Sequence, residues 1–176
     1  LINKVYGSTI DETFKISEEK RVEDKSKITI SAIHNAYLKN FGYLHKREIN
    51  FLKKESYIKG IDTLLKKNDT NREVNFSIRF HIYPGLDAFR TVGGSDILLQ
   101  VNKNNSYIFS SKNQKLEIEK SLFLGRNKIL NNNCIVIYGK TKNQDEKIEW
   151  ELKKANWMKN LKINNALISV SDKSNL

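Results

Sequence analysis

Apolar and polar residues alternate along most of the chain, the period of two that predicts β-strands. The clearest run is Val74–Gly85, VNFSIRFHIYPG, in which every second residue from Val74 to Ile82 is apolar. Successive side chains of a strand point to opposite faces, so polar Arg79, His81 and Tyr83 should form a row on the second face. Pro84-Gly85 predicts a turn after the strand. The row could bind an acidic group, or could simply be the solvated outer face of a sheet.

Nine further runs predict strands, at Thr13–Ile16, Lys27–His34, Tyr43–Leu52, Ser56–Leu64, Ile97–Val101, Tyr107–Ser110, Leu116–Glu119, Cys134–Tyr138 and Lys147–Leu152. Polar turn residues separate these runs, and Glu18–Asp24 is predicted to be a charged turn near the N-terminus. Another turn is predicted at Phe41-Gly42. Long helical crossover segments are lacking, which favours antiparallel pairing. The pattern therefore predicts an all-β protein, an antiparallel β-sandwich of two packed sheets over residues 1–155.

Composition is consistent with one folded domain, since 39% of the 176 residues are hydrophobic. No run of about 18 apolar residues is present, so no membrane span is expected. No signal peptide is visible, and because the chain opens on Leu1 we expect it to be an N-terminally truncated fragment. The single cysteine, Cys134, lies in the apolar run CIVIY and is expected to be buried without a disulfide.

The chain is strongly basic, with a formal net charge of +11. A basic surface favours a polyanionic partner such as nucleic acid, anionic lipid or an acidic polysaccharide. Most of the basic residues are lysines scattered among asparagine and isoleucine, which genome composition or the protection of strand edges would also explain. Nucleic acid is the least favoured partner, because aromatic residues do not cluster with basic ones as stacking platforms require.

The segment His34–Arg47, HNAYLKNFGYLHKR, contains the other candidate site residues: His34, Tyr37, His45 and Arg47. Histidine titrates near neutral pH and tyrosine is a phenolic donor, so these residues could transfer protons. The histidine spacing matches no zinc signature. A metal site would need the fold to bring His81 to the other two histidines.

Four motifs in this order resemble the C-terminal β-sandwich of heparinase II/III-like polysaccharide lyases. HNAY, FG and HKR at residues 34–47 are similar to that family's HDGY, FG and HRR, and RFHIYPG at residues 79–85 is similar to its RFHLHPG. SLFLG at 121–125 and WELK at 150–153 are similar to its SVYLG and closing WxL-basic strand. The resemblance extends over about residues 2–154. Asparagine, alanine and tyrosine replace family residues at positions 35, 36 and 83.

The resemblance implies a lyase that acts by β-elimination on uronic-acid-containing polysaccharides. The family's principal catalysts lie in an N-terminal α-helical toroid and upstream sandwich segments, so none is expected in this chain, whose partners would be that toroid and an acidic polysaccharide. Substrate-binding helpers would be His34, Tyr37, His45, Arg47, Arg79 and His81. No cofactor is expected in this chain, although the full-length parent could hold a divalent metal. The resemblance is compatible with the periplasm. The alternative function is a non-catalytic carbohydrate-binding or structural module.

The tail differs from the rest of the chain. From Met158 it reads MKNLKINNALISVSDKSNL, which resembles the start of the bifunctional purine-biosynthesis enzyme with formyltransferase and inosine-monophosphate cyclohydrolase activities. The match is about a dozen residues long and includes no catalytic group of that enzyme. Residues 156–176 are therefore predicted to be an unrelated tail, either disordered or derived from a neighbouring coding region.

Overall fold

The computed structural model describes residues 13–68, 73–125 and 128–155, and most of these residues lie in β-strands. The predicted tail at 156–176 lies outside these residues. Eleven strands and one short helix are present in the described ranges: β1 Ile16–Glu23, β2 Lys27–His34, α1 Leu38–Phe41, β3 Tyr43–Leu52, β4 Tyr57–Lys66, β5 Asn75–His81, β6 Asp87–Arg90, β7 Ile97–Asn102, β8 Asn105–Ser111, β9 Leu116–Gly125, β10 Lys128–Lys140 and β11 Glu146–Lys154.

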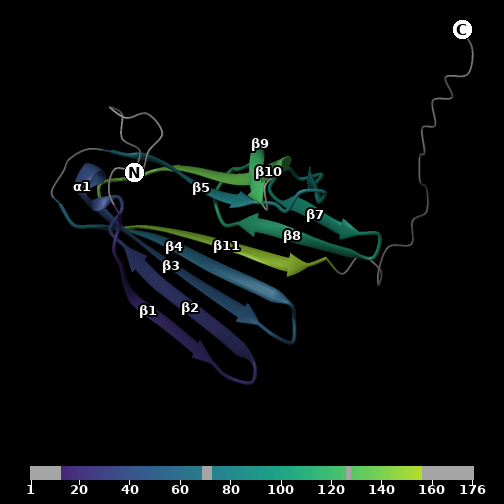
Figure 1. Ribbon diagram of the computed structural model, residues 1–176, viewed down its shortest axis with the longest axis horizontal. Coiled ribbons are helices and arrows are strands. Elements are labelled where there is room, and N and C mark those ends of the chain that lie inside the picture. Colours follow the sequence, from purple (N-terminus) through teal and green to yellow (C-terminus); the bar gives the residue numbers. More distant parts are fainter. Residues whose placement is uncertain (1–12, 69–72, 126–127, 156–176) are drawn as a thin grey trace, which may run out of the picture.

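The strands form two antiparallel sheets that lie in two layers (Figure 1). The larger sheet has eight strands in the order β1-β2-β3-β4-β11-β8-β7-β6, and the smaller has three in the order β5-β10-β9. Two packed antiparallel sheets confirm the predicted all-β sandwich. Among the described residues, no helix is long and apolar enough to cross a membrane.

Aromatic side chains from both sheets meet in the core. Phe80 of β5 lies 4.8 Å, between ring centroids, from both Phe109 of β8 and Trp150 of β11. Around these rings pack fully buried aliphatic residues such as Ile97 of β7 and Ile135 of β10. Burial of this apolar surface is the main force that holds the two layers together.

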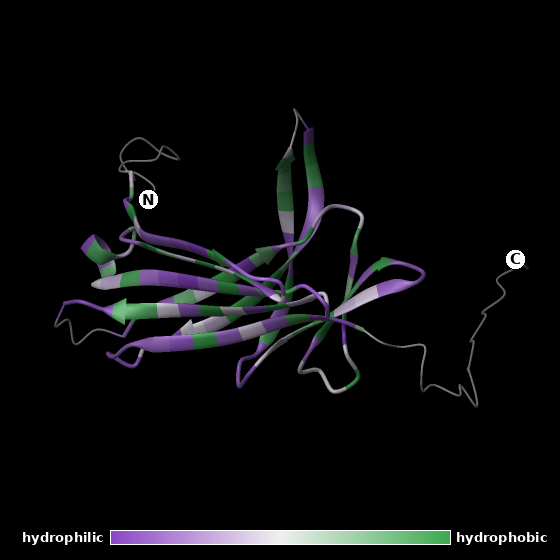
Figure 2. Ribbon diagram, turned by 90° about the horizontal axis from the view of Figure 1, so that it is seen from below, coloured by the Kyte–Doolittle hydropathy of each residue, from purple (hydrophilic) through white to green (hydrophobic). Residues whose placement is uncertain are grey.

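Strand β5 has the two faces that its alternation predicts. Phe76, Ile78 and Phe80 face the core, and the next apolar residue, Ile82, is also buried. Hydrophobic and hydrophilic residues that alternate along the strands are visible in Figure 2. The strand ends at His81, two residues before the predicted end, and Gly85 adopts a φ of 88° in the following turn.

The N-terminal prediction was wrong in detail. The charged segment predicted as a turn, Glu18–Asp24, is mostly strand β1, and the strand predicted at Thr13–Ile16 begins only at its last residue. Every β1 residue is exposed because β1 is the edge of the large sheet, where water satisfies the charged side chains of both faces. The turn is confined to the residues after β1, where the Asp24 carboxylate accepts backbone hydrogen bonds from Ser26 and Lys27.

Other elements also differ from the sequence pattern. The short strand β6 was missed because its charged ends hide the alternation, and β9 and β10 extend beyond the predicted strands. The predicted turn at Phe41-Gly42 is the end of the single helical turn α1, and Gly42, which caps this helix, has a φ of 78°. A left-handed glycine is a common helix end, and here it directs the chain into β3.

Candidate functional site

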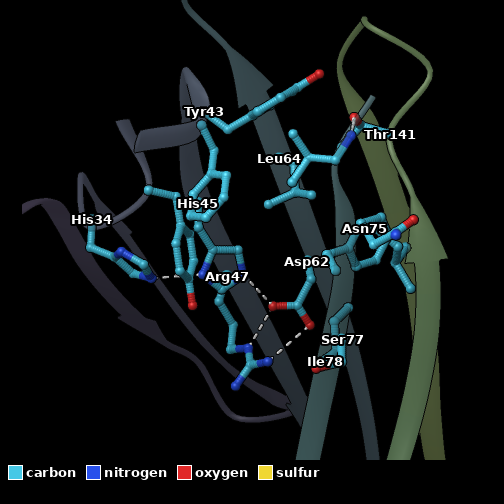
Figure 3. A pocket seen from close by; sticks show the side chains of 15 residues that line it. His34, Tyr43, His45, Arg47, Asp62, Leu64, Asn75, Ser77, Ile78 and Thr141 are labelled. Carbon is cyan, nitrogen blue, oxygen red and sulfur yellow. Dashed lines mark hydrogen bonds and ion pairs between the residues drawn. The ribbon is translucent and has the colours of Figure 1, made fainter. Parts of the chain in front are cut away.

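A pocket of about 500 Å³ lies between the two sheets, next to α1 (Figure 3). Strands β2, β3 and β4 and the segment around α1 supply one wall, and the first half of β5 and residues after β10 supply the other. The volume is in the range of pockets that bind small molecules. Four of the predicted site residues line this pocket, namely His34, Tyr37, His45 and Arg47.

The register of the strands explains why these residues meet. His34 of β2 is directly opposite His45 of β3, and Arg47 of β3 is directly opposite Asp62 of β4. His45 and Arg47 are two positions apart, so both point to the same face of β3. Antiparallel pairing of three consecutive strands thus places two histidines, an arginine and a carboxylate in one row (Figure 3).

Asp62 is the centre of this row. Only 1% of its side chain is exposed, and it accepts four hydrogen bonds. Arg47 donates from Nε to Oδ1 at 2.7 Å and from Nη2 to Oδ2 at 3.2 Å. His45 Nε2 lies 2.7 Å from Oδ1, and the Trp150 indole N–H donates to Oδ2 at 2.8 Å. Such a carboxylate is fully satisfied, as a buried charge must be.

The surroundings of Asp62 keep it ionised. Burial by itself would raise the pKa of this carboxyl, but hydrogen bonds from His45, Arg47 and Trp150 and the positive charge of Arg47 lower the pKa below its usual value. The ionised form is therefore a fixed acceptor for the histidine next to it.

The two histidines form a chain that leads to Asp62. His34 Nε2 lies 2.8 Å from His45 Nδ1, and the Ala36 backbone N–H donates to His34 Nδ1 at 3.3 Å. Burial, and then the neighbouring His45 and Arg47, lower the pKa of His34. The hydrogen bonds are consistent with neutral rings that each carry the proton on Nε2, because this assignment gives every contact one donor and one acceptor.

Aromatic side chains enclose the outer end of the histidine pair. The Tyr37 ring lies edge-on to His34 at 5.3 Å between centroids and is 42% exposed. Tyr43 is buried, and its hydroxyl has no hydrogen-bond partner among the described residues. A phenol at the opening and an unpartnered phenol in the wall are groups that could contact a polar ligand.

Arg79 and His81 lie elsewhere, on the outer face of the small sheet. Arg79 pairs with Glu119 of β9 at 2.8 Å, and His81 Nδ1 lies 3.0 Å from the Ser121 hydroxyl. The fold therefore divides the six predicted residues into four in the pocket and two outside it. His81 does not join His34 and His45, and the described ranges contain no group of three or more His, Cys, Asp or Glu side chains that could hold a metal ion.

Comparison with known proteins identifies the family. The model of the heparinase II/III-like C-terminal domain matches residues 7–151. The chain belongs to this family. No curated protein matches the chain.

Solved heparinases have the same fold as this heparinase II/III-like domain. Heparan sulfate lyase HepC from Pedobacter heparinus superposes with a TM-score of 0.67 at 14% identity, over 80% of this chain and 22% of that one. A heparinase III gene product superposes with a TM-score of 0.61 at 10% identity, over 78% of this chain and 21% of that one. The chain thus spans about a fifth of the length of these structures.

Sequence reasoning missed the residue at the centre of the pocket, Asp62. A signal was present: Ile58, Gly60, Asp62 and Leu64 share one face of β4, so a carboxylate interrupts a face of apolar and small residues. A charged residue on a buried face requires a partner, and this requirement could have directed attention to the basic residues of β3. The distant Trp150 could not have been connected to Asp62 without the order of strands, which makes β11 the neighbour of β4.

The structure confirms the predicted burial of Cys134. It is a free cysteine on β10 with no exposed surface. Burial raises the pKa of its thiol, so it remains protonated and packs as a small apolar residue.

Proposed function

We propose that this chain is the C-terminal sandwich part of a polysaccharide lyase that cleaves uronic-acid-containing polysaccharides by β-elimination. Membership of the heparinase II/III-like family supports the proposal, as does the similarity in fold to heparan sulfate lyase HepC. Because the chain spans about a fifth of such a protein, we expect the principal catalysts in the rest of it, in an N-terminal α-helical toroid.

The chemistry of β-elimination defines what the pocket would need to supply. The uronate carboxylate must be neutralised so that the neighbouring C5 proton becomes acidic, a base must remove this proton, and an acid must protonate the departing oxygen. A guanidinium meets the first need, and imidazole and phenol groups meet the others. The observation that carries the proposal is the row of Arg47, His45 and His34 in one pocket with Tyr37.

Arg47 is the residue best placed to receive a substrate carboxylate. Asp62 holds its Nε and Nη2 atoms, which orients the guanidinium and leaves Nη1 outside these bonds. The side chain is 37% exposed, so part of it is open to solvent. An arginine held in this way loses little conformational entropy when it binds an anion.

The proposal assigns Arg79 and His81 a smaller role in substrate binding. Each is paired with a β9 side chain, so a structural role on the outer face of the small sheet is preferred, with contact to a long substrate as the alternative.

A second function, a non-catalytic carbohydrate-binding or structural module, is favoured by one observation. Both ring nitrogens of His34 and of His45 are occupied by hydrogen bonds within the protein, so neither imidazole has a free nitrogen to act as a base. In this case the pocket binds the polysaccharide but the whole protein does not cleave it.

Absorbance of the unsaturated product separates the two functions. The chain alone and the full-length protein are incubated with uronate polysaccharides while the absorbance of the new double bond is followed. We expect turnover by the full-length protein and none by the chain alone. Turnover by the chain alone would contradict the placement of the catalysts, and binding without turnover by the full-length protein would support the second function.

A further inference from the structure

The hydrogen bonds between His34, His45 and Asp62 all run in one direction. Ionised Asp62 can only accept, so His45 must carry a proton on Nε2. When His45 is neutral, its Nδ1 is an acceptor and His34 must donate to it from Nε2. His34 Nδ1 then accepts from the Ala36 N–H. Asp62 thereby determines the tautomer of both rings.

One consequence is that the neutral pair has no free ring nitrogen. A proton can be added to a ring nitrogen only if one of these three hydrogen bonds breaks. The longest of the three is the 3.3 Å bond from the Ala36 N–H to His34 Nδ1. Protonated at this position, His34 would still donate to His45 from Nε2. The other contacts of the row therefore survive protonation.

The charges around His34 decide when this proton is taken up. The titratable or charged groups that face it are Tyr37 before α1, His45 and Arg47 on β3, and Asp62 on β4. Strand β5 contributes uncharged Asn75 and Ser77 to the opposite wall. The charges of Arg47 and Asp62 cancel, so the pocket with a neutral histidine pair has no net charge.

A substrate carboxylate changes this balance. An anion placed in a partly buried pocket without net positive charge loses hydration that Arg47, whose charge Asp62 already balances, repays only in part. A proton on the histidine pair supplies the missing charge, and the anion in turn favours the protonated imidazole. Anion binding and proton uptake should therefore occur together.

We propose that Asp62 is a positioning residue that makes the binding of an anionic sugar in this pocket proton-coupled, with the His34–His45 pair as the group that takes up the proton. This inference rests on the proposed function, which it deepens by naming the carboxylate of an acidic sugar as the ligand. Linkage then requires the dissociation constant to rise about tenfold per pH unit above the pKa of His34.

The first test is the tautomer of each histidine in the ligand-free chain. Nitrogen NMR of the imidazoles should show Nε2–H and an unprotonated Nδ1 for both His34 and His45 near neutral pH. Asp62→Asn should mix the tautomers, because an amide can turn either its oxygen or its NH₂ group to His45. The control Trp150→Phe removes another partner of Asp62 but leaves its charge, and should keep both tautomers. A Nδ1–H form of His45 in the unaltered protein would overturn the proposal, whether or not the variants fold.

The second test is calorimetric titration of the full chain with a glucuronate-containing oligosaccharide, in two buffers with different ionisation enthalpies. We expect uptake of close to one proton per bound oligosaccharide. Asp62→Asn should abolish this uptake and flatten the pH dependence, because Arg47 is then uncompensated and the pocket is already positive. A residue with only a structural role would weaken binding equally at every pH.

The outcomes distinguish this inference from the proposed function. Binding to the unaltered chain without proton uptake, or parallel pH profiles for the chain and its Asp62→Asn variant, would overturn the inference and leave the proposed function intact. Absence of binding would contradict the proposed pocket and with it the coupling.

Discussion

The indole of Trp150 packs directly against the backbone of Gly60, its cross-strand neighbour. A Cβ atom at position 60 would lie 2.0 Å from Cζ2 of the indole. The missing side chain of Gly60 is what allows the ring to lie flat over β4 and its Nε1–H to reach Asp62. Trp150 thus links the core of the sandwich to Asp62, which lines the pocket.

Gly60→Ala should therefore destabilise the sandwich and disturb the pocket. Overpacking in a filled core typically costs about 1–3 kcal/mol, and displacement of the indole would also remove one donor from Asp62. Urea unfolding measures the loss of stability. The matched control is Gly93→Ala, at an open turn where a Cβ would meet nothing closer than 3.9 Å. Equal stability of the two variants would show that the indole can shift without cost.

Asp62→Ala should be one of the most destabilising substitutions in the chain. Removal of one partner of a buried ion pair costs roughly 3–5 kcal/mol, and we expect the lower part of this range because Arg47, which is 37% exposed, can turn to water. The buried N–H of Trp150 cannot turn to water in this way. Asp87→Ala, which removes an exposed carboxylate, serves as the control in urea unfolding.

The same carboxylate should contribute to acid unfolding. Its pKa is lowered in the folded state, so its contribution to stability is complete above the unfolded value of about 3.9 and is lost as pH falls through the folded pKa. The stability difference between the unaltered chain and Asp62→Ala should therefore shrink at low pH. A difference that stays constant down to acid pH would contradict the ion-pair account.

His34 should make stability fall on mild acidification. Burial lowers its folded pKa, so the unfolded chain binds the proton more tightly. The destabilisation that His34 causes is absent above its pKa in the unfolded chain, about 6.5. It grows as the pH drops below this value and becomes constant below the pKa in the folded chain. Comparison of urea unfolding at about pH 7.5 and pH 5.5 should show a smaller loss for His34→Gln than for the unaltered chain. His81→Gln, at an exposed histidine of the other sheet, should behave like the unaltered chain.

Local alternation predicted the fold well but could not assemble the site. The faces of β5 and the bounds of β2 and β3 follow from side-chain period alone, because a strand with one buried face repeats every two residues. Edge strand β1 has no buried face, so alternation carries no information there and its charges suggested a turn. The pairing of His45 with His34 is local, since their strands are consecutive. The position of Arg79 and His81 on another sheet depends on sheet order, which the sequence pattern does not contain.

The affinity of the chain for a glucuronate-containing oligosaccharide, compared between Arg47→Ala and Arg79→Ala, tests the central claim most directly. Both arginines are partly exposed and paired with a carboxylate, but only Arg47 lines the pocket. We predict that Arg47→Ala weakens binding by about tenfold or more, the loss of one charge-assisted contact of roughly 1.5–3 kcal/mol, whereas Arg79→Ala changes it less than about twofold. An equal loss of affinity in both variants would show that the general positive charge of the chain, and not the pocket, binds the oligosaccharide. A larger loss of affinity in Arg79→Ala would place the binding site on the outer face of the small sheet.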